Sequence, residues 1–443
     1  MATTIIRARI AHTPRDPFRD GSDPGAALET YDDGALAFAG DGRIGTLGDW
    51  TEVRRAHPRA AVQDRRDCVL LPGLVDLHVH YPQIAVIGTM GLQLLDWLQR
   101  RTLPEEARMA DPGHAAVTAR RFVGALAANG TTTALVFGSH FPGAQEELFR
   151  VAAARGLRIA SGLVVSDRNL RPDLEVSPEE AHRESRALIE RWHGRGRLRY
   201  AVTPRFSVSC TEAMLEACRA LLDETPGLLL TSHVNEHPRE IALVAELFPG
   251  ARDYVDTYEA AGLLRAGSVL AHDVHVSDDE LRRLAAARTS VAHCPSSNAF
   301  IGSGIFAMAR HVRHGVRFGL GTDVGAGAGL SLFNEGLTAY QLQMVHSDRH
   351  PLTPAHLLHL ATASGARALG LQDEVGDLTS GKAADFVLVR PPAGSTLETV
   401  LGAAPDWPAA LGALFTLARE ESVAEVRVAG EIVFPREGDR ANA

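Results

Sequence analysis

Between residues 68 and 374 the sequence repeats one pattern, in which a short apolar, β-branched run is followed by a longer stretch with helical periodicity. This alternation predicts parallel strands covered by helices, because the chain needs a crossover to reach each next parallel strand. The eight runs are Val69 to His80, Thr131 to Phe137, Arg158 to Val165, Leu198 to Thr203, Leu228 to Val234, Ser268 to Ala271, Ser290 to Ala292 and Val316 to Gly319. Eight such units predict an α/β fold of the (β/α)8 TIM-type barrel.

The two ends of the chain follow a different pattern. Strand-like runs flank Gly40-Asp41-Gly42, which is a hairpin signal, and strand-like alternation returns at Asp385 to Val389. We therefore predict a small β-sandwich domain that is built from both termini, residues 1–67 and 375–443. The barrel is expected to span residues 68–374.

Composition narrows the class of protein. The 443-residue chain has 45 basic and 54 acidic residues and a net charge of −9, which argues against binding to nucleic acid or to anionic membranes. Its four cysteines form no C-x-x-C pair, which is typical of free thiols in a reducing compartment. The sequence contains neither the apolar core of a signal peptide nor an apolar run long enough to span a bilayer. We expect a cytoplasmic protein that acts on a small molecule.

The first run ends in a His-x-His motif, His78-Val79-His80. Side chains alternate between the two faces of a strand, so both imidazoles are expected to point to the same side. Two neighbouring imidazoles at a strand end can bind one divalent metal ion, provided that other strands supply further ligands. The alternative for an isolated motif of this kind is that one histidine packs in the core and the other is a polar strand-end residue.

Further polar residues fall at the ends of later runs, where barrel enzymes carry their active sites. They are Arg205 and Phe206 after the fourth run, His233 and Glu236 after the fifth, His272 after the sixth and Asp323 after the eighth. Their repeated occurrence at successive strand ends makes a purely structural role for the whole set improbable.

The residue types suggest chemical roles. We expect His78, His80, His233 and Asp323 to hold one ion, because a bound divalent ion lowers the pKa of water towards neutrality. Glu236, three residues beyond His233, is expected to move protons to and from that water. His272 is expected to hydrogen-bond the attacking water, and Asp323 to act as a proton acceptor as well as a ligand.

The lysine content bears on the number of ions. A second bridged metal in barrels of this kind commonly needs a carbamylated lysine at the end of a middle strand. Lys382 is the only lysine of the chain, and it lies in the C-terminal β region. We therefore expect one metal ion per chain: Zn2+, with iron or manganese as alternatives.

Several motifs resemble the deaminase branch of the amidohydrolase superfamily, and among its members the guanine deaminases. They are Pro72-Gly73-Leu74-Val75-Asp76, His78-Val79-His80-Tyr81-Pro82-Gln83, Leu94-Leu95-Asp96-Trp97-Leu98, Leu103-Pro104-Glu105-Glu106, Asn129-Gly130-Thr131-Thr132-Thr133, Thr203-Pro204-Arg205-Phe206, Ala292-His293-Cys294-Pro295-Ser296-Ser297-Asn298 and Gly319-Leu320-Gly321-Thr322-Asp323-Val324. The resemblance implies zinc-dependent hydrolysis of guanine to xanthine and ammonia, in purine catabolism, by a homodimer. It also implies that Gln83 and Arg205 hydrogen-bond the base and that Phe206 holds its ring. Trp97 is expected to line the same pocket or, alternatively, to anchor the core.

Alternatives remain open at this point. The chain could be another amidohydrolase that acts on a different aminopurine, a pyrimidine or a triazine, or a barrel without catalysis. Cys294 as a nucleophile is a weaker hypothesis, because it leaves the His-x-His motif unexplained. Asp273 stands where the family tends to have glycine, and could change the charge near the metal and the preference for substrate.

Overall fold

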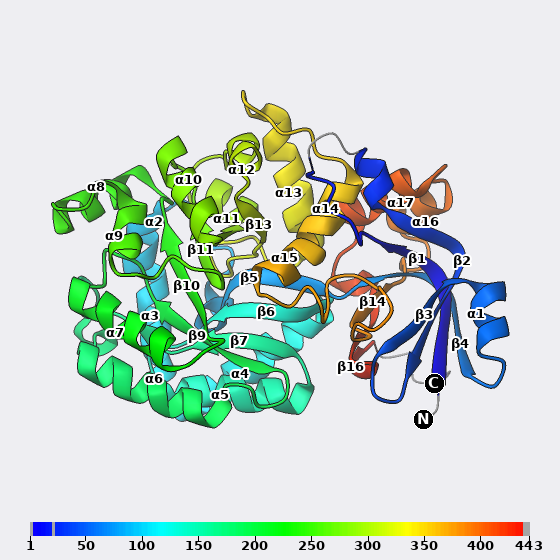
Figure 1. Cartoon of the computed structure of the whole chain (residues 1–443), viewed down its shortest axis with the longest axis horizontal. Helices are drawn as coiled ribbons and strands as arrows, with labels where there is room; N and C mark the ends of the chain where they lie inside the picture. Colours follow the sequence, from blue (N-terminus) through cyan, green and yellow to red (C-terminus); the bar gives the residue numbers. More distant parts are fainter. Residues whose placement is uncertain (1–2, 20–22, 437–443) are drawn as a thin grey trace.

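Eight parallel strands form the barrel that the sequence predicts (Figure 1). In order they are β5 (Leu74–His80), β6 (Thr131–Phe137), β7 (Arg158–Gly162), β9 (Leu198–Pro204), β10 (Leu229–Val234), β11 (Ser268–His272), β12 (Ser290–His293) and β13 (Arg317–Leu320), and the short β8 (Val164–Val165) pairs with β9. The loop after β13 joins β5 through hydrogen bonds from Asp323 N to His78 O (2.7 Å) and from His80 N to Val324 O (2.9 Å). The (β/α)8 prediction is confirmed.

This computed structural model describes residues 3–19 and 23–436. Residues 1–2, 20–22 and 437–443, which belong to the terminal segments expected to form the β domain, lie outside the described residues.

Helices cover the outside of the barrel. They are α4 (Pro112–Ala128), α5 (Pro142–Arg155), α6 (Pro178–Trp192), α7 (Glu212–Glu224), α8 (Pro238–Leu247), α9 (Tyr254–Ala260), α10 (Asp278–Ala287), α12 (Met308–His314), α13 (Leu332–Val345), α14 (Pro354–Ala361) and α15 (Ala363–Ala368). Short helices α2 (Leu94–Trp97), α3 (Leu103–Ala107) and α11 (Pro295–Phe300) lie in loops. Several helices begin at a side chain that accepts a backbone N–H, among them Ser177, Thr211 and Ser277, and these caps fix where the helices start.

A second sheet contains strands from both ends of the chain. Its order is β16 (Glu431–Pro435), β15 (Val423–Val428), β14 (Phe386–Val389), β4 (Ala61–Pro72), β1 (Thr3–His12), β2 (Glu29–Ala39) and β3 (Ile44–Asp49), with α1 (Trp50–Ala56) after β3. The expected separate β structure from both termini is present, and its seven strands belong to one continuous hydrogen-bonded sheet.

The first predicted run is divided between the two sheets. Val69 to Pro72 pair with β14 in the terminal sheet, and only Leu74 to His80 enter the barrel. The division falls at Gly73, where a β-carbon would lie 2.2 Å from Thr132 Oγ1. Only glycine lets the backbone pass β6 this closely, so the start of the barrel strand shifts from Val69 to Leu74.

An apolar stretch near the C-terminus packs into the hydrophobic core. It forms α17 (Trp407–Leu417), which follows α16 (Thr396–Gly402), and Leu411, Leu414 and Phe415 are at most 1% exposed. Gly336 of α13 makes room for the ring of Phe415, because a β-carbon there would lie 2.6 Å from it.

Among the described helices, none combines the length and the apolar character that a membrane crossing needs.

Candidate metal centre and active site

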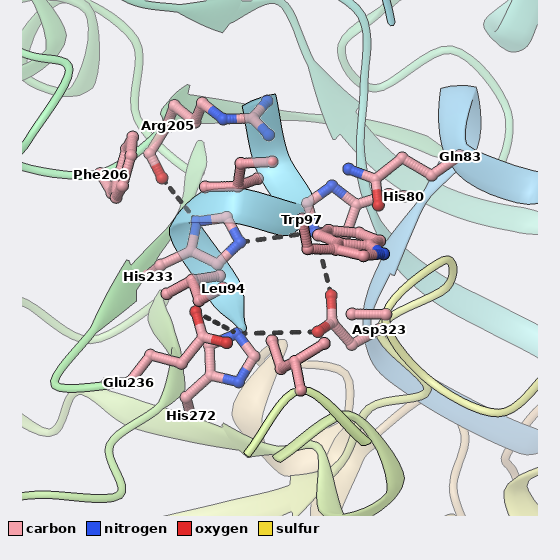
Figure 2. Close-up of a pocket in the computed structure, with 13 residues that line it drawn as sticks. His80, Gln83, Leu94, Trp97, Arg205, Phe206, His233, Glu236, His272 and Asp323 are labelled. Carbon is pink, nitrogen blue, oxygen red and sulfur yellow. Dashed lines mark hydrogen bonds and ion pairs between the residues drawn. The ribbon is translucent and has the colours of Figure 1, made fainter. Parts of the chain in front are cut away.

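The carboxyl ends of the barrel strands surround one pocket with about 370 Å³ of empty space (Figure 2). Its lining residues are His80, Gln83, Leu94, Trp97, Leu98, Arg205, Phe206, His233, Glu236, His272, Ile301, Asp323 and Ala326. All of the predicted site residues except His78 line this pocket, and His78 contacts two of the lining residues, His80 and Asp323.

The four predicted metal ligands come together. His80 Nε2 lies 3.0 Å from His78 Nε2 and 3.4 Å from His233 Nε2. Asp323 Oδ1 lies 3.1 Å from His80 Nε2 and 3.3 Å from His78 Nε2. Ligand atoms around a tetrahedral ion with bonds of about 2.0–2.1 Å are about 3.3 Å apart, so these separations suit one ion.

The protonation of the histidines also fits a metal. Burial lowers the pKa of His78 to about 4 and lowers that of His233 well below its ordinary value, so both rings are neutral at pH 7. The Nδ1–H of His233 donates to the carbonyl oxygen of Arg205 at 2.6 Å, which leaves the Nε2 lone pair directed at the cluster. A neutral imidazole with its lone pair free is the form that binds a transition metal.

His272 lies at the edge of this cluster. Its Nε2 is 3.8 Å from Asp323 Oδ2 and 3.4 Å from Glu236 Oε2, farther than the contacts that join His80 to His78 and Asp323. A four-atom group of His78, His233, His272 and Asp323, all within 4.8 Å of one another, is also possible by proximity alone. The shorter distances favour His80 over His272 as a ligand.

Glu236 has the environment of a general acid and base. Burial raises the pKa of its carboxyl well above the ordinary value, and the nearby charge of Asp323 adds to the effect. Its Oε1 accepts a hydrogen bond from Ser303 Oγ at 3.3 Å, and its Oε2 faces His272. A carboxyl group held in this way can both take up and release a proton near neutral pH.

Three residues that contact Asp323, His272 or Glu236 had no predicted role. Ser297 Oγ donates to Asp323 Oδ2 at 2.6 Å, and Asn298 Oδ1 lies 2.9 Å from His272 Nδ1. Ser297 and Asn298 belong to a motif that carried the family resemblance, which was the signal available for them. Ser303 lies on a loop between two glycines and has no comparable signal in the sequence.

The backbone at these strand ends is strained. Asn235, His272, Asp273 and Asp323 have positive φ angles of 49°, 78°, 47° and 47°, in the region that favours glycine. Such strain persists only where surrounding contacts hold it, and it concentrates at functional sites. The strain turns the chain sharply after β10, β11 and β13, so that successive side chains at each end point in different directions.

The four predicted substrate-contacting residues form the upper part of the pocket in Figure 2. Gln83 and Arg205 are each 2% exposed, and Gln83 Oε1 accepts from Gly325 N at 3.0 Å. Phe206 lies beside His233, with ring centroids 6.3 Å apart. Trp97 lines the pocket as well, and its buried indole N–H has no hydrogen-bond partner among the described residues.

Asp273 does not face the pocket. Its carboxylate accepts from Asn235 Nδ2 at 3.1 Å and lies 2.9 Å from His311 Nε2, and both Asp273 and His311 are fully buried. The other ring nitrogen of His311, Nδ1, lies 3.0 Å from the carbonyl oxygen of Ala307. Asp273 therefore occupies a glycine-favouring backbone position, and its carboxylate contacts Asn235 and His311 instead of the pocket.

Asp273→Asn is expected to lower stability and leave the choice of substrate unchanged. The asparagine keeps the shape but loses the charge that partners His311, so the free energy of unfolding should fall by about 1–3 kcal/mol. Thermal unfolding and relative rates on a panel of bases measure the two effects. A changed order of substrates would show that Asp273 acts on the pocket after all.

Comparison with known proteins places the chain in a well-defined group. A model of the amidohydrolase family matches residues 69–433. A protein of Deinococcus radiodurans named probable guanine deaminase is 55% identical over 440 residues, covering 98% of this chain and 99% of the relative. The structure of Escherichia coli guanine deaminase superimposes with a TM-score of 0.94 at 34% identity, covering 98% of this chain and all of that one. Guanine deaminase from Bradyrhizobium japonicum gives a TM-score of 0.93 at 32% identity, covering 99% and 100%.

Proposed function

Because the chain belongs to the amidohydrolase family, we propose that it is a guanine deaminase that hydrolyses guanine to xanthine and ammonia with one zinc ion. The observation that carries this proposal is that one pocket joins the metal-ready cluster to Gln83, Arg205 and Phe206. The relatives named as guanine deaminases, which align over nearly the whole chain, support the same substrate.

The metal ligands we assign are His78, His80, His233 and Asp323. Three imidazoles and one carboxylate form a donor set that suits zinc, with iron or manganese as alternatives. The ion would supply a water of lowered pKa and polarise the group under attack. The only lysine, Lys382, pairs with Asp377 in the C-terminal part of the chain, which supports one ion rather than two.

The chain's own residues carry the proton transfers. Glu236 takes a proton from the attacking water as oxygen bonds to C2 of guanine, and it delivers a proton to the C2 amine, which leaves as ammonia. His272 Nδ1 is directed at Asn298, so its Nε2 faces Glu236 and can hydrogen-bond the water or the reacting carbon's oxygen. Asp323 accepts the remaining proton of the water, and this proton is returned to the ring nitrogen N3, which carries a hydrogen in xanthine. The net reaction consumes one water and replaces the amine with a carbonyl.

Binding of the base is assigned to four residues. Gln83 and Arg205 would hydrogen-bond the polar edge of guanine, while Phe206 and Trp97 would contact its faces. We further propose, from the family resemblance, a homodimer that acts in purine catabolism in the cytoplasm. Size-exclusion chromatography with light scattering tests the homodimer.

Ammonia release from a panel of bases tests the function. The panel contains guanine, adenine, 8-oxoguanine, cytosine, ammeline and guanosine, and the protein is loaded with zinc. Strong selectivity for guanine is the expected result. Turnover of another base with guanine inert would favour the second candidate, an amidohydrolase for a different aminopurine, pyrimidine or triazine. No turnover with metal bound would favour a barrel without catalysis.

Arg205→Ala is expected to lower kcat/KM for guanine by about 10- to 100-fold, because a charged hydrogen bond to the base is lost. The variant also leaves the buried carboxylate of Glu106 without its nearest cation, so its thermal unfolding is measured in parallel. Steady-state kinetics on folded protein provide the test. Unchanged kinetics would remove Arg205 from the binding site.

A further inference from the structure

A buried carboxylate, that of Glu106, lies behind the polar wall of the pocket, which is the part formed by Gln83 and Arg205. Glu106 of α3 is 3% exposed and does not line the pocket, but it contacts two polar residues that do, Gln83 and Arg205. Its Oε1 accepts from Gln83 Nε2 at 2.8 Å, and its Oε2 accepts from Arg205 Nη1 at 2.6 Å. Glu106 thus joins two residues that come from different strand ends.

These contacts decide which polar atoms the wall can offer to a ligand. The amide of Gln83 is held at both ends, because its Oε1 accepts from Gly325 N while its Nε2 donates to Glu106. The amide therefore cannot flip, and its remaining N–H is a donor. Arg205 has donors only, and Nη1 is directed towards Glu106. A wall fixed in this way favours hydrogen-bond acceptors on the ligand.

Glu106 keeps its negative charge at neutral pH. Burial opposes its ionisation, but the positive charge of Arg205 and the hydrogen bond with His140 together outweigh burial and lower its pKa well below the ordinary value. His140 Nε2 lies 3.4 Å from Glu106 Oε2. The carboxylate therefore remains an acceptor for both Gln83 and Arg205 at neutral pH.

We propose that Glu106 is a positioning residue. It holds Gln83 and Arg205 so that they offer only hydrogen-bond donors to the pocket, and this selects bases that carry hydrogen-bond acceptors along one edge. This inference rests on the proposed function. Guanine offers such an edge at O6 and N7, where arginine commonly binds with two hydrogen bonds. 2-Aminopurine has the same C2 amine and keeps N7 but lacks O6, so it serves as the probe that should benefit less from the wall.

Glu106→Gln removes the charge and replaces one acceptor oxygen with a donor. Gln83 and Arg205 then compete for the remaining oxygen, and the Gln83 amide can rotate to present its oxygen to the ligand. A role limited to stability would weaken binding of both bases equally. A role in positioning would weaken binding of guanine more than binding of 2-aminopurine.

The experiment compares Kd and KM for guanine with the Kd of 2-aminopurine, whose fluorescence reports its binding, in the zinc-loaded protein. In Glu106→Gln we expect the guanine-to-2-aminopurine affinity ratio to fall by about 10- to 100-fold, with KM for guanine raised more than kcat is lowered. Glu106→Asp keeps the charge and should give an intermediate ratio. Glu105→Gln is the matched control, because Glu105 is the adjacent residue of α3 and pairs with Arg108 and His114 instead.

An unchanged ratio in Glu106→Gln would overturn the proposal, as would an equal fall in Glu105→Gln. If Glu106→Gln does not fold, the ratio in Glu106→Asp decides in the same way. Failure of the proposed function is separable, because it would appear as absent guanine turnover in the unmodified protein, whatever the ratio of affinities in the variants.

Discussion

Glu236→Gln is expected to lower kcat for guanine by about 10²- to 10⁴-fold, the usual contribution of a general acid and base. Glutamine has nearly the same shape and can still accept from Ser303, which lies 3.3 Å from Glu236 Oε1. It cannot take a proton from water or deliver one to the leaving amine. The variant should therefore bind metal and guanine as the unmodified protein does and fail at the chemical step.

The measurement combines kcat, metal content and affinity for guanine in the same preparation. Glu246→Gln is a matched control, because it makes the same change at an exposed position of α8. Normal turnover by Glu236→Gln would exclude the proton-transfer role. Loss of metal together with activity would instead indicate that Glu236 supports the metal centre.

Removal of the metal is expected to abolish activity and to be reversed by one equivalent of zinc per chain. We assign the ligand atoms for one ion to His78, His80, His233 and Asp323, whose side chains lie together. Without a bound ion the pKa of the attacking water would not be lowered. Dialysis against a chelator, metal analysis and titration with zinc provide the test.

His78→Ala should lose both the ion and the activity, because it removes a fully buried side chain that we propose as a ligand. Lys382→Ala is the contrasting variant, since Lys382 pairs with Asp377 and should not affect metal content. Two ions per chain in the unmodified protein would contradict the single-site prediction. Full activity in the metal-free protein would contradict the role of the metal altogether.

The local pattern of the sequence determined the barrel and the approximate site. Strand periodicity placed His78 and His80 on one side of β5, and the rule that barrel strands end at one face brought them to His233 and Asp323. These inferences succeed because alternation along a strand and the direction of parallel strands are properties of the backbone, which short stretches of sequence encode.

The tertiary structure alone decided where side chains point once a strand has ended. The positive φ of Asp273 turns its carboxylate towards His311 and away from the pocket, although its neighbour His272 faces the site. The sequence placed Asp273 near the metal because proximity along the chain does not specify direction in a left-handed turn.

Contacts between distant segments were likewise outside the reach of the sequence. Glu106 meets Gln83 and Arg205 only because α3 folds over the ends of β5 and β9, and Ser303 reaches Glu236 only through the loop after α11. Gly73 divides one apolar run between two sheets because β6 passes too close for a side chain. The sequence thus predicted the residues to which we assign the chemistry, whereas packing between segments far apart in the chain decided which residues hold them in place, because such contacts leave no periodic signal.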